Sequence, residues 1–102
     1  MTTAELAIIG CVIQWPNESI PALTESGIRP EVFESRAASL IFQTAATCWL
    51  ERRPCDVIGI ATALGDRLPE VGGAAGLYET LSGASIPATV GHYATIVKEA
   101  HA

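Results

Sequence analysis

The sequence predicts an all-α domain of about six or seven short helices. Residues that cap helices recur at short intervals, and apolar residues follow helical spacing. No segment shows the sustained alternation of apolar and polar residues that is typical of a half-buried strand. With 102 residues, 49% of them hydrophobic and 17% charged, the chain can bury a core of its own. We therefore expect residues 1–102 to form a single domain.

The first helix is expected to begin at the N-terminus. Thr2 and Glu5 have the spacing of a capping box, in which each side chain accepts a hydrogen bond from the other residue's backbone N–H. The apolar run 6–13 follows, and the cap favours a helix over a buried strand for it. Trp15-Pro16-Asn17 is expected to end this helix.

Two short helices should follow. Asn17 or Ser19 is the candidate cap of the second helix, which Ser26-Gly27 would stop. Pro30 suits the first turn of the third helix, because its φ is already helical and its missing N–H is not needed there.

The clearest helical pattern covers about residues 35–53. Its inward stripe, two residues wide, consists of Leu40, Ile41, Thr44, Ala45, Cys48 and Trp49. Arg52 and Arg53 then fall in the last turn, where positive charge interacts favourably with the helix dipole, and Pro54 ends the helix.

The remaining segments continue the helical pattern. Asp56 is the expected N-cap of the next helix, and a loop with Pro69 leads to another that Ser82-Gly83 closes. Pro87 is expected to open the last helix. The apolar stripe of that helix is Tyr93, Ile96, Val97 and Ala100.

No nucleotide site is expected in this chain. A phosphate loop needs the pattern G-x-x-x-x-G-K-[ST], and the only lysine, Lys98, lies in the last expected helix. The glycine-rich segment 72–76 has no strand before it, so we interpret it as the entry turn of a helix.

Catalytic and metal-ligating patterns are also missing. Cys11, Cys48 and Cys55 lack the short paired spacing of zinc ligands, and the two histidines, His92 and His101, are nine residues apart. Nothing local joins either of the later cysteines to His92 as a nucleophile and its base. We expect buried, reduced thiols and neither a cofactor nor a metal in this domain.

Charge and hydropathy exclude further classes. Eleven acidic against six basic residues leave a formal net charge of −5, which repels phosphates, so direct DNA binding is not expected. The longest apolar run is far shorter than the roughly 20 residues of a membrane span. It also lacks the basic flank of a signal peptide. We therefore expect a cytoplasmic domain that does not contact a membrane.

Two features are candidates for contact with a partner protein. Arg52-Arg53 is the only adjacent basic pair, and it is interpreted either as the C-terminal cap of a helix or as a docking point for an anionic group. Trp15 lies at a helix end, where a large apolar side chain can stay partly exposed, and tryptophan is enriched at interaction hot spots. Packing of Trp15 over the first helix is the alternative.

Short motifs along the chain stand in a specific order. They are Glu5-Leu6-Ala7, Gly10-Cys11-Val12-Ile13, Pro16, Pro30-Glu31-Val32-Phe33, Leu40-Ile41-Phe42, Pro54-Cys55-Asp56, Val71-Gly72-Gly73, Ile86-Pro87 and Tyr93-Ala94-Thr95-Ile96-Val97. In order and spacing they resemble the N-terminal domain of DnaB-type replicative DNA helicases, over about residues 4–99. The chain departs from that pattern at Ala38, usually histidine, at Trp15, usually polar, and in a shortened segment 87–93.

The resemblance implies an all-helical head without a catalytic site of its own. In full-length helicases a helical hairpin, a linker and a RecA-like ATPase domain follow, and ATP and Mg²⁺ belong to that last domain. The heads form a collar on a hexameric ring, dock the primase and in some systems influence loading. The implied partners are thus primase, further copies of the chain (a monomer or dimer for these residues alone) and, in some systems, a helicase loader.

Two other functions stay open at this point. One is the helicase-binding domain of a primase, which has a similar helical fold, and the other is a free-standing regulator that mimics the helicase head. The VGG and YA-x-IV motifs favour the helicase.

The charge generates the first prediction. We expect no appreciable DNA binding at physiological salt, because a charge of −5 opposes the counterion release that supplies non-specific affinity. A mobility-shift titration with single- and double-stranded DNA tests this. A salt-sensitive shift at low micromolar protein would contradict it.

Overall fold

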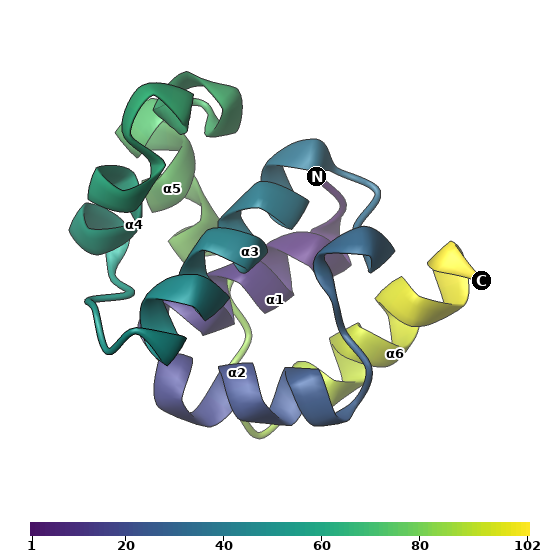
Figure 1. The fold of residues 1–102 in the computed structure, drawn as a ribbon. Helices are drawn as coiled ribbons and strands as arrows, with labels where there is room; N and C mark the ends of the chain where they lie inside the picture. The colour runs from purple at the N-terminus through teal and green to yellow at the C-terminus, as the bar shows by residue number, and fades with distance from the viewer.

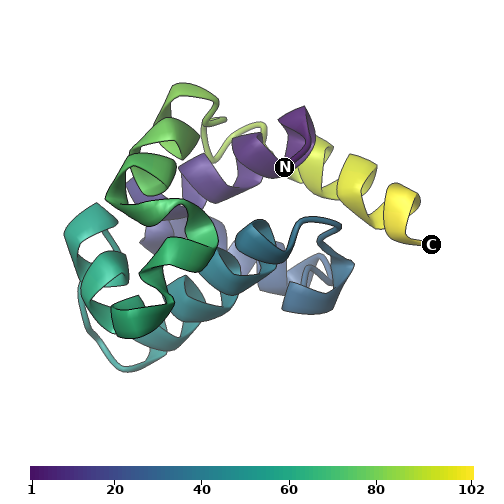
Figure 2. The same ribbon diagram turned by 90° about the horizontal axis from the view of Figure 1, so that it is seen from above.

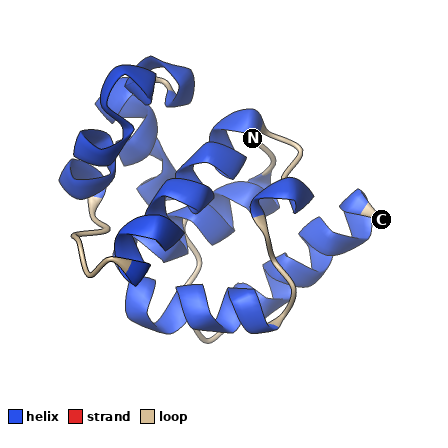
Figure 3. Ribbon diagram, viewed as in Figure 1, coloured by secondary structure: helices blue, strands red, loops and turns tan.

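The computed structural model describes residues 1–102, seen from two directions in Figures 1 and 2 and by secondary structure in Figure 3. Its α-helices are α1 (Thr3–Gln14), α2 (Pro16–Glu25), α3 (Arg36–Leu50), α4 (Val57–Leu64), α5 (Gly73–Ser82) and α6 (Val90–His101). Two 3₁₀ helices, η1 (Pro30–Val32) and η2 (Gly65–Val71), complete the chain. No strand is present, so the predicted all-α fold class is confirmed. None of the helices has the length and apolar character that a membrane span requires.

α1 is the central helix of the fold. It packs against α2, α3, α5 and α6, with α4 and α5 on one side of the molecule and α6 on the other (Figure 1). Nine of its twelve residues are buried. Burial on nearly every side explains why its sequence is a continuous apolar run instead of an amphipathic pattern.

α5 approaches α1 closely at Gly10. A Cβ atom at this position would lie 2.3 Å from the carbonyl oxygen of Thr80 and 2.5 Å from the Cβ of Ala84. Both distances are far inside van der Waals contact, so the packing of these two segments requires glycine here.

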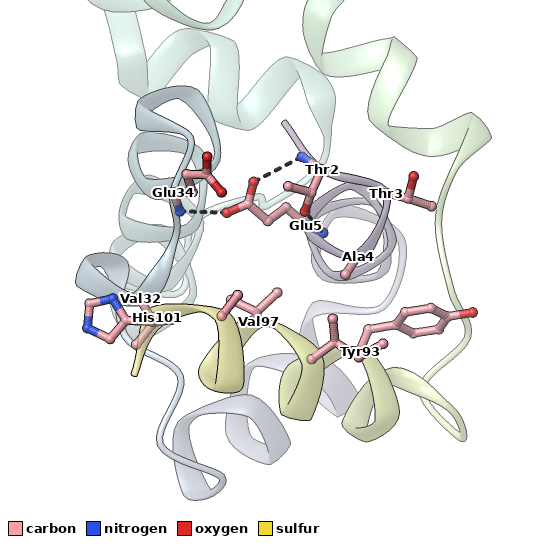
Figure 4. A pocket seen from close by; sticks show the side chains of 11 residues that line it. Thr2, Thr3, Ala4, Glu5, Val32, Glu34, Tyr93, Val97 and His101 are labelled. Carbon is pink, nitrogen blue, oxygen red and sulfur yellow. Dashed lines mark hydrogen bonds between the residues drawn. The ribbon is translucent and has the colours of Figure 1, made fainter.

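The Glu5 carboxylate accepts hydrogen bonds from the backbone at the starts of two helices, α1 and α3. As predicted, it forms a capping box with Thr2: each side chain accepts a hydrogen bond of 3.1 Å from the other residue's backbone N–H. Its second oxygen, Oε2, accepts from the backbone N–H of Glu34 at 2.6 Å and from that of Ser35 at 3.4 Å (Figure 4). Ser35 is the N-cap of α3, so the carboxylate joins the start of α1 to the segment that enters α3. The side chain is only 2% exposed, and these hydrogen bonds replace its lost contacts with water.

α3 ends earlier than the predicted boundary. It stops at Leu50, so Arg52 and Arg53 lie beyond the helix and the prediction that they occupy its last turn was wrong. The backbone N–H of Arg52 donates to the carbonyl of Trp49 at 3.1 Å, and that of Arg53 to the carbonyl of Cys48 at 2.8 Å. These are the two bonds of a Schellman motif, which places Arg52 at a left-handed φ of 59°. Glycine is usual at that position, and its absence is why the sequence did not indicate the helix end.

α2 also begins earlier than predicted. Pro16 is its first residue, and neither Asn17 nor Ser19 caps it. Proline suits this first turn, so the helix starts directly after Trp15. The Asn17 side chain instead accepts a hydrogen bond from the indole of Trp49, and the buried hydroxyl of Ser19 has no partner.

Two details of the C-terminal half differ from the predictions. The expected loop around Pro69 is the 3₁₀ helix η2. α6 begins at Val90 and not at Pro87, which lies in a turn closed by a hydrogen bond from the Thr89 N–H to the Ile86 carbonyl at 3.0 Å. The buried face of α6 is Val90, Ala94 and Val97, so only Val97 of the predicted stripe is buried.

The Glu5 contacts generate a stability prediction. Glu5→Gln should lower the free energy of unfolding by about 2 kcal/mol, because hydrogen bonds to a charged group contribute roughly 1.5–3 kcal/mol and the new NH₂ group cannot accept. Chemical denaturation measures the change. Glu34→Gln is the matched control, because Glu34 contributes its backbone N–H to this contact and its own side chain is exposed. Equal losses in the two variants would contradict the role assigned to Glu5.

The left-handed residue generates the opposite prediction. Arg52→Gly should raise the free energy of unfolding by about 1 kcal/mol, because a left-handed backbone costs a non-glycine residue roughly 1–2 kcal/mol, a gain that the extra chain entropy of glycine partly offsets. Thermal and urea unfolding measure it. Arg29→Gly, at an exposed arginine with extended backbone (φ −135°), should give no such gain. A less stable Arg52→Gly variant would refute the strain argument.

Candidate protein-interaction surfaces

The residues considered for nucleotide or metal binding do not come together. No group of three or more His, Cys, Asp or Glu side chains is placed to hold a metal ion. Gly72 and Gly73 have positive φ at the entry of α5, so the glycine-rich segment is the helix-entry turn that the sequence predicted. The amine of Lys98, the only lysine, donates to the carbonyl of Ser26 at the end of α2.

The cysteines have the environment of packed thiols. All three are free and buried. Burial raises the pKa of Cys11, and burial together with the neighbouring Cys48 raises the pKa of Cys55. A raised pKa leaves less thiolate at neutral pH, which is the opposite of what an activated nucleophile needs. His92 is exposed, and its ring packs edge-on against Tyr93 with the centroids 5.2 Å apart.

An apolar groove of about 580 Å³ lies between the start of α1, η1 and α6 (Figure 4). Its apolar lining is Ala4, Val32, Tyr93, Ile96, Val97 and Ala100. The stripe that the sequence assigned to the last helix therefore faces this groove more than the core. The last turns of α6 extend beyond the other α-helices (Figure 2).

A second hollow, which we call the basic hollow, lies between the end of α3 and the start of α2. It measures about 570 Å³ and is lined by Pro16, Asn17, Trp49, Leu50, Arg52, Arg53 and Cys55. The indole N–H of Trp49 donates to Asn17 Oδ1 at 3.0 Å and so joins the two helices. Arg53 pairs with Glu51 at 2.5 Å, whereas Arg52 makes no ion pair.

The structure separates the predicted partner-binding residues. Arg52 and Arg53 line the same hollow. Trp15 lies at the junction of α1 and α2, half-buried and packed against the core, and does not line the hollow although its neighbour Pro16 does. Trp49 was missed as a surface residue because it belongs to the inward stripe of α3. A tryptophan one turn before a basic pair at a helix end is the signal that could have identified it.

Comparisons with known proteins found a family and a similar solved structure. The model of the DnaB-like helicase N-terminal domain family matches residues 1–99. The crystal structure of the N-terminal domain of DnaB helicase from Mycobacterium tuberculosis is similar, with a TM-score of 0.88 and 27% identity over 97% of this chain and 69% of that chain. No curated protein matches.

The family match occupies almost all of the described residues. Residues 1–99 match the N-terminal domain alone, which leaves no room within these 102 residues for a helicase ATPase domain. The resemblance in motif order is thereby confirmed. The chain belongs to the DnaB-like helicase N-terminal domain family.

Proposed function

We propose that the chain acts in DNA replication as the protein-interaction domain of a replicative helicase, docking the primase and supporting assembly of the helicase ring. The observation that carries this proposal is the family match over residues 1–99. The similarity of the fold to a solved helicase N-terminal domain, at a TM-score of 0.88, supports it.

The surface of the domain suits this role. Large apolar side chains are exposed on several helices, among them Leu50 on α3, Ile58 on α4, Tyr78 on α5 and Ile96 on α6. Two concave regions, the apolar groove and the basic hollow, lie among such residues. Exposed apolar patches with polar rims are typical of protein contacts, and neither region holds the residues of an active site.

The proposal extends to cofactors, location and assembly. The domain works in the cytoplasm without a cofactor, and ATP and Mg²⁺ serve the ATPase domain of the full-length helicase. It self-associates within a hexamer in that context and forms a monomer or dimer alone. A helicase loader is a further partner in some systems.

The primase contact is tested by calorimetry. The domain is titrated with the C-terminal domain of the primase encoded in the same genome, and we expect saturable binding. Analytical ultracentrifugation of the domain alone gives its oligomeric state. Absence of binding would remove primase as the partner.

Trp15 is proposed to contribute to this contact from its half-buried position. Trp15→Ala should weaken primase binding about thirtyfold, since truncation of an interface tryptophan costs about 2 kcal/mol or more. The thermal stability of the variant is measured in parallel. A loss of stability with unchanged affinity would assign Trp15 to the core alone.

The helicase is distinguished from a primase domain or a free-standing regulator by the gene. A helical hairpin, a linker and then a RecA-like ATPase domain, encoded after residue 102, are the expected result.

A further inference from the structure

We propose that the basic hollow binds an acidic segment of a partner protein that also carries an apolar anchor side chain, and that Arg52 selects it. The inference rests on the proposed function only in that the partner is a protein docked on a helicase head. It concerns the chemistry of the contact, which the family match does not address.

The backbone of Arg52 is the first observation. Every other residue with positive φ in this chain is a glycine, at positions 27, 65, 72 and 73. Arg52 occupies such a position with a large side chain, although glycine would be accommodated there without strain. Non-glycine residues held in this region are concentrated at functional sites.

The side chain of Arg52 is unused by the fold. Its guanidinium forms no ion pair, whereas Arg29, Arg53 and Arg67 each pair with a glutamate. Lys98 is bound to a backbone carbonyl. The Arg52 guanidinium therefore has no ion-pair partner within the chain, and its charge is free for an external anion.

The charges around Arg52 determine whether an anionic ligand can approach it. The hollow is lined by two arginines and no carboxylate. Arg36, the other arginine without an ion pair, lies instead in a hollow that also contains Glu31 and Glu70. Because Arg53 is paired with Glu51, the uncompensated positive charge of the basic hollow is that of Arg52, on a chain of net charge −5. Repulsion from the distant acidic residues is screened beyond about 8–10 Å at physiological salt, so the local charge governs contact.

Three of the lining residues, Pro16, Trp49 and Leu50, are apolar. Trp49 is held by its hydrogen bond to Asn17, Pro16 lies beside it, and Leu50 on the rim is 74% exposed. An apolar side chain of the partner would pack against these residues while a carboxylate meets Arg52. A protein segment can place a single carboxylate beside an apolar side chain, whereas a nucleic acid strand carries further phosphates beyond the hollow and onto a chain of net charge −5.

The direct test uses the 102-residue chain and two capped peptides. Ac-Glu-Leu-Asp-Glu-Leu-Phe-NH₂ is the probe, and its neutral isostere Ac-Gln-Leu-Asn-Gln-Leu-Phe-NH₂ is the matched control. In ¹H–¹⁵N spectra the acidic peptide should shift the amides of Arg52 and Arg53 and the indole of Trp49 saturably. The neutral peptide should bind about tenfold more weakly, because charge-assisted hydrogen bonds are the stronger ones. Equal shifts, shifts centred on the apolar groove, no shifts, or stronger binding of a short oligothymidylate would overturn the proposal.

Arg52→Gly separates binding from folding. The variant should melt at a higher temperature than the wild type and yet bind the acidic peptide about tenfold more weakly, since one hydrogen-bonded charge is removed. A purely structural role cannot give these opposite signs. Arg29→Gly removes the same charge outside the hollow and should leave the affinity unchanged. Wild-type affinity in Arg52→Gly would refute the proposal.

The outcomes distinguish this inference from the proposed function. If the primase domain binds and the acidic peptide does not, primase docking stands and the chemistry assigned to the hollow is wrong. If the peptide binds at Arg52 and the primase domain does not, the chemistry assigned to the basic hollow is supported and the identification of primase as the partner is wrong.

Discussion

The fold depends on one buried carboxylate. Glu5 lies in the first turn of the helix that contacts most of the others, and its two oxygens accept hydrogen bonds from the backbone at Thr2, Glu34 and Ser35. A buried carboxylate without partners would cost several kilocalories per mole, so this side chain ties α1 to the entry of α3 in one arrangement. A helix start is a natural place for it, because free N–H groups and the helix dipole both favour negative charge there.

The helices that surround α1 pack against it in different ways. α5 must approach α1 at Gly10, and α2 must turn back directly after Trp15. α6 packs on α1 through Val90, Ala94 and Val97, which leaves Tyr93 and Ile96 toward a groove. α6 therefore leaves part of its apolar surface exposed, at Ile96.

The basic hollow combines local strain with unused charge. Its two arginines follow a helix that ends without the usual glycine, and the hydrogen bonds of the Schellman motif hold Arg52 in place. Natural proteins break local rules mainly where function requires it. Here the left-handed arginine, its unpaired guanidinium and Trp49 line a single hollow.

Local patterns in the sequence determined the helices themselves. The Thr2–Glu5 box, the stripe of α3, the Asp56 cap and the glycines before α5 all act within about one turn of the chain, where spacing and backbone chemistry suffice. The order of these motifs also indicated the family. Tertiary structure alone decided the partners of Glu5 some thirty residues away, the left-handed turn at Arg52, and the side of α6 that is buried. It also brought Pro16 and Asn17 beside Trp49 and the two arginines. Helical periodicity indicates which face of a helix is apolar, but it does not indicate which other helix that face packs against or at what angle.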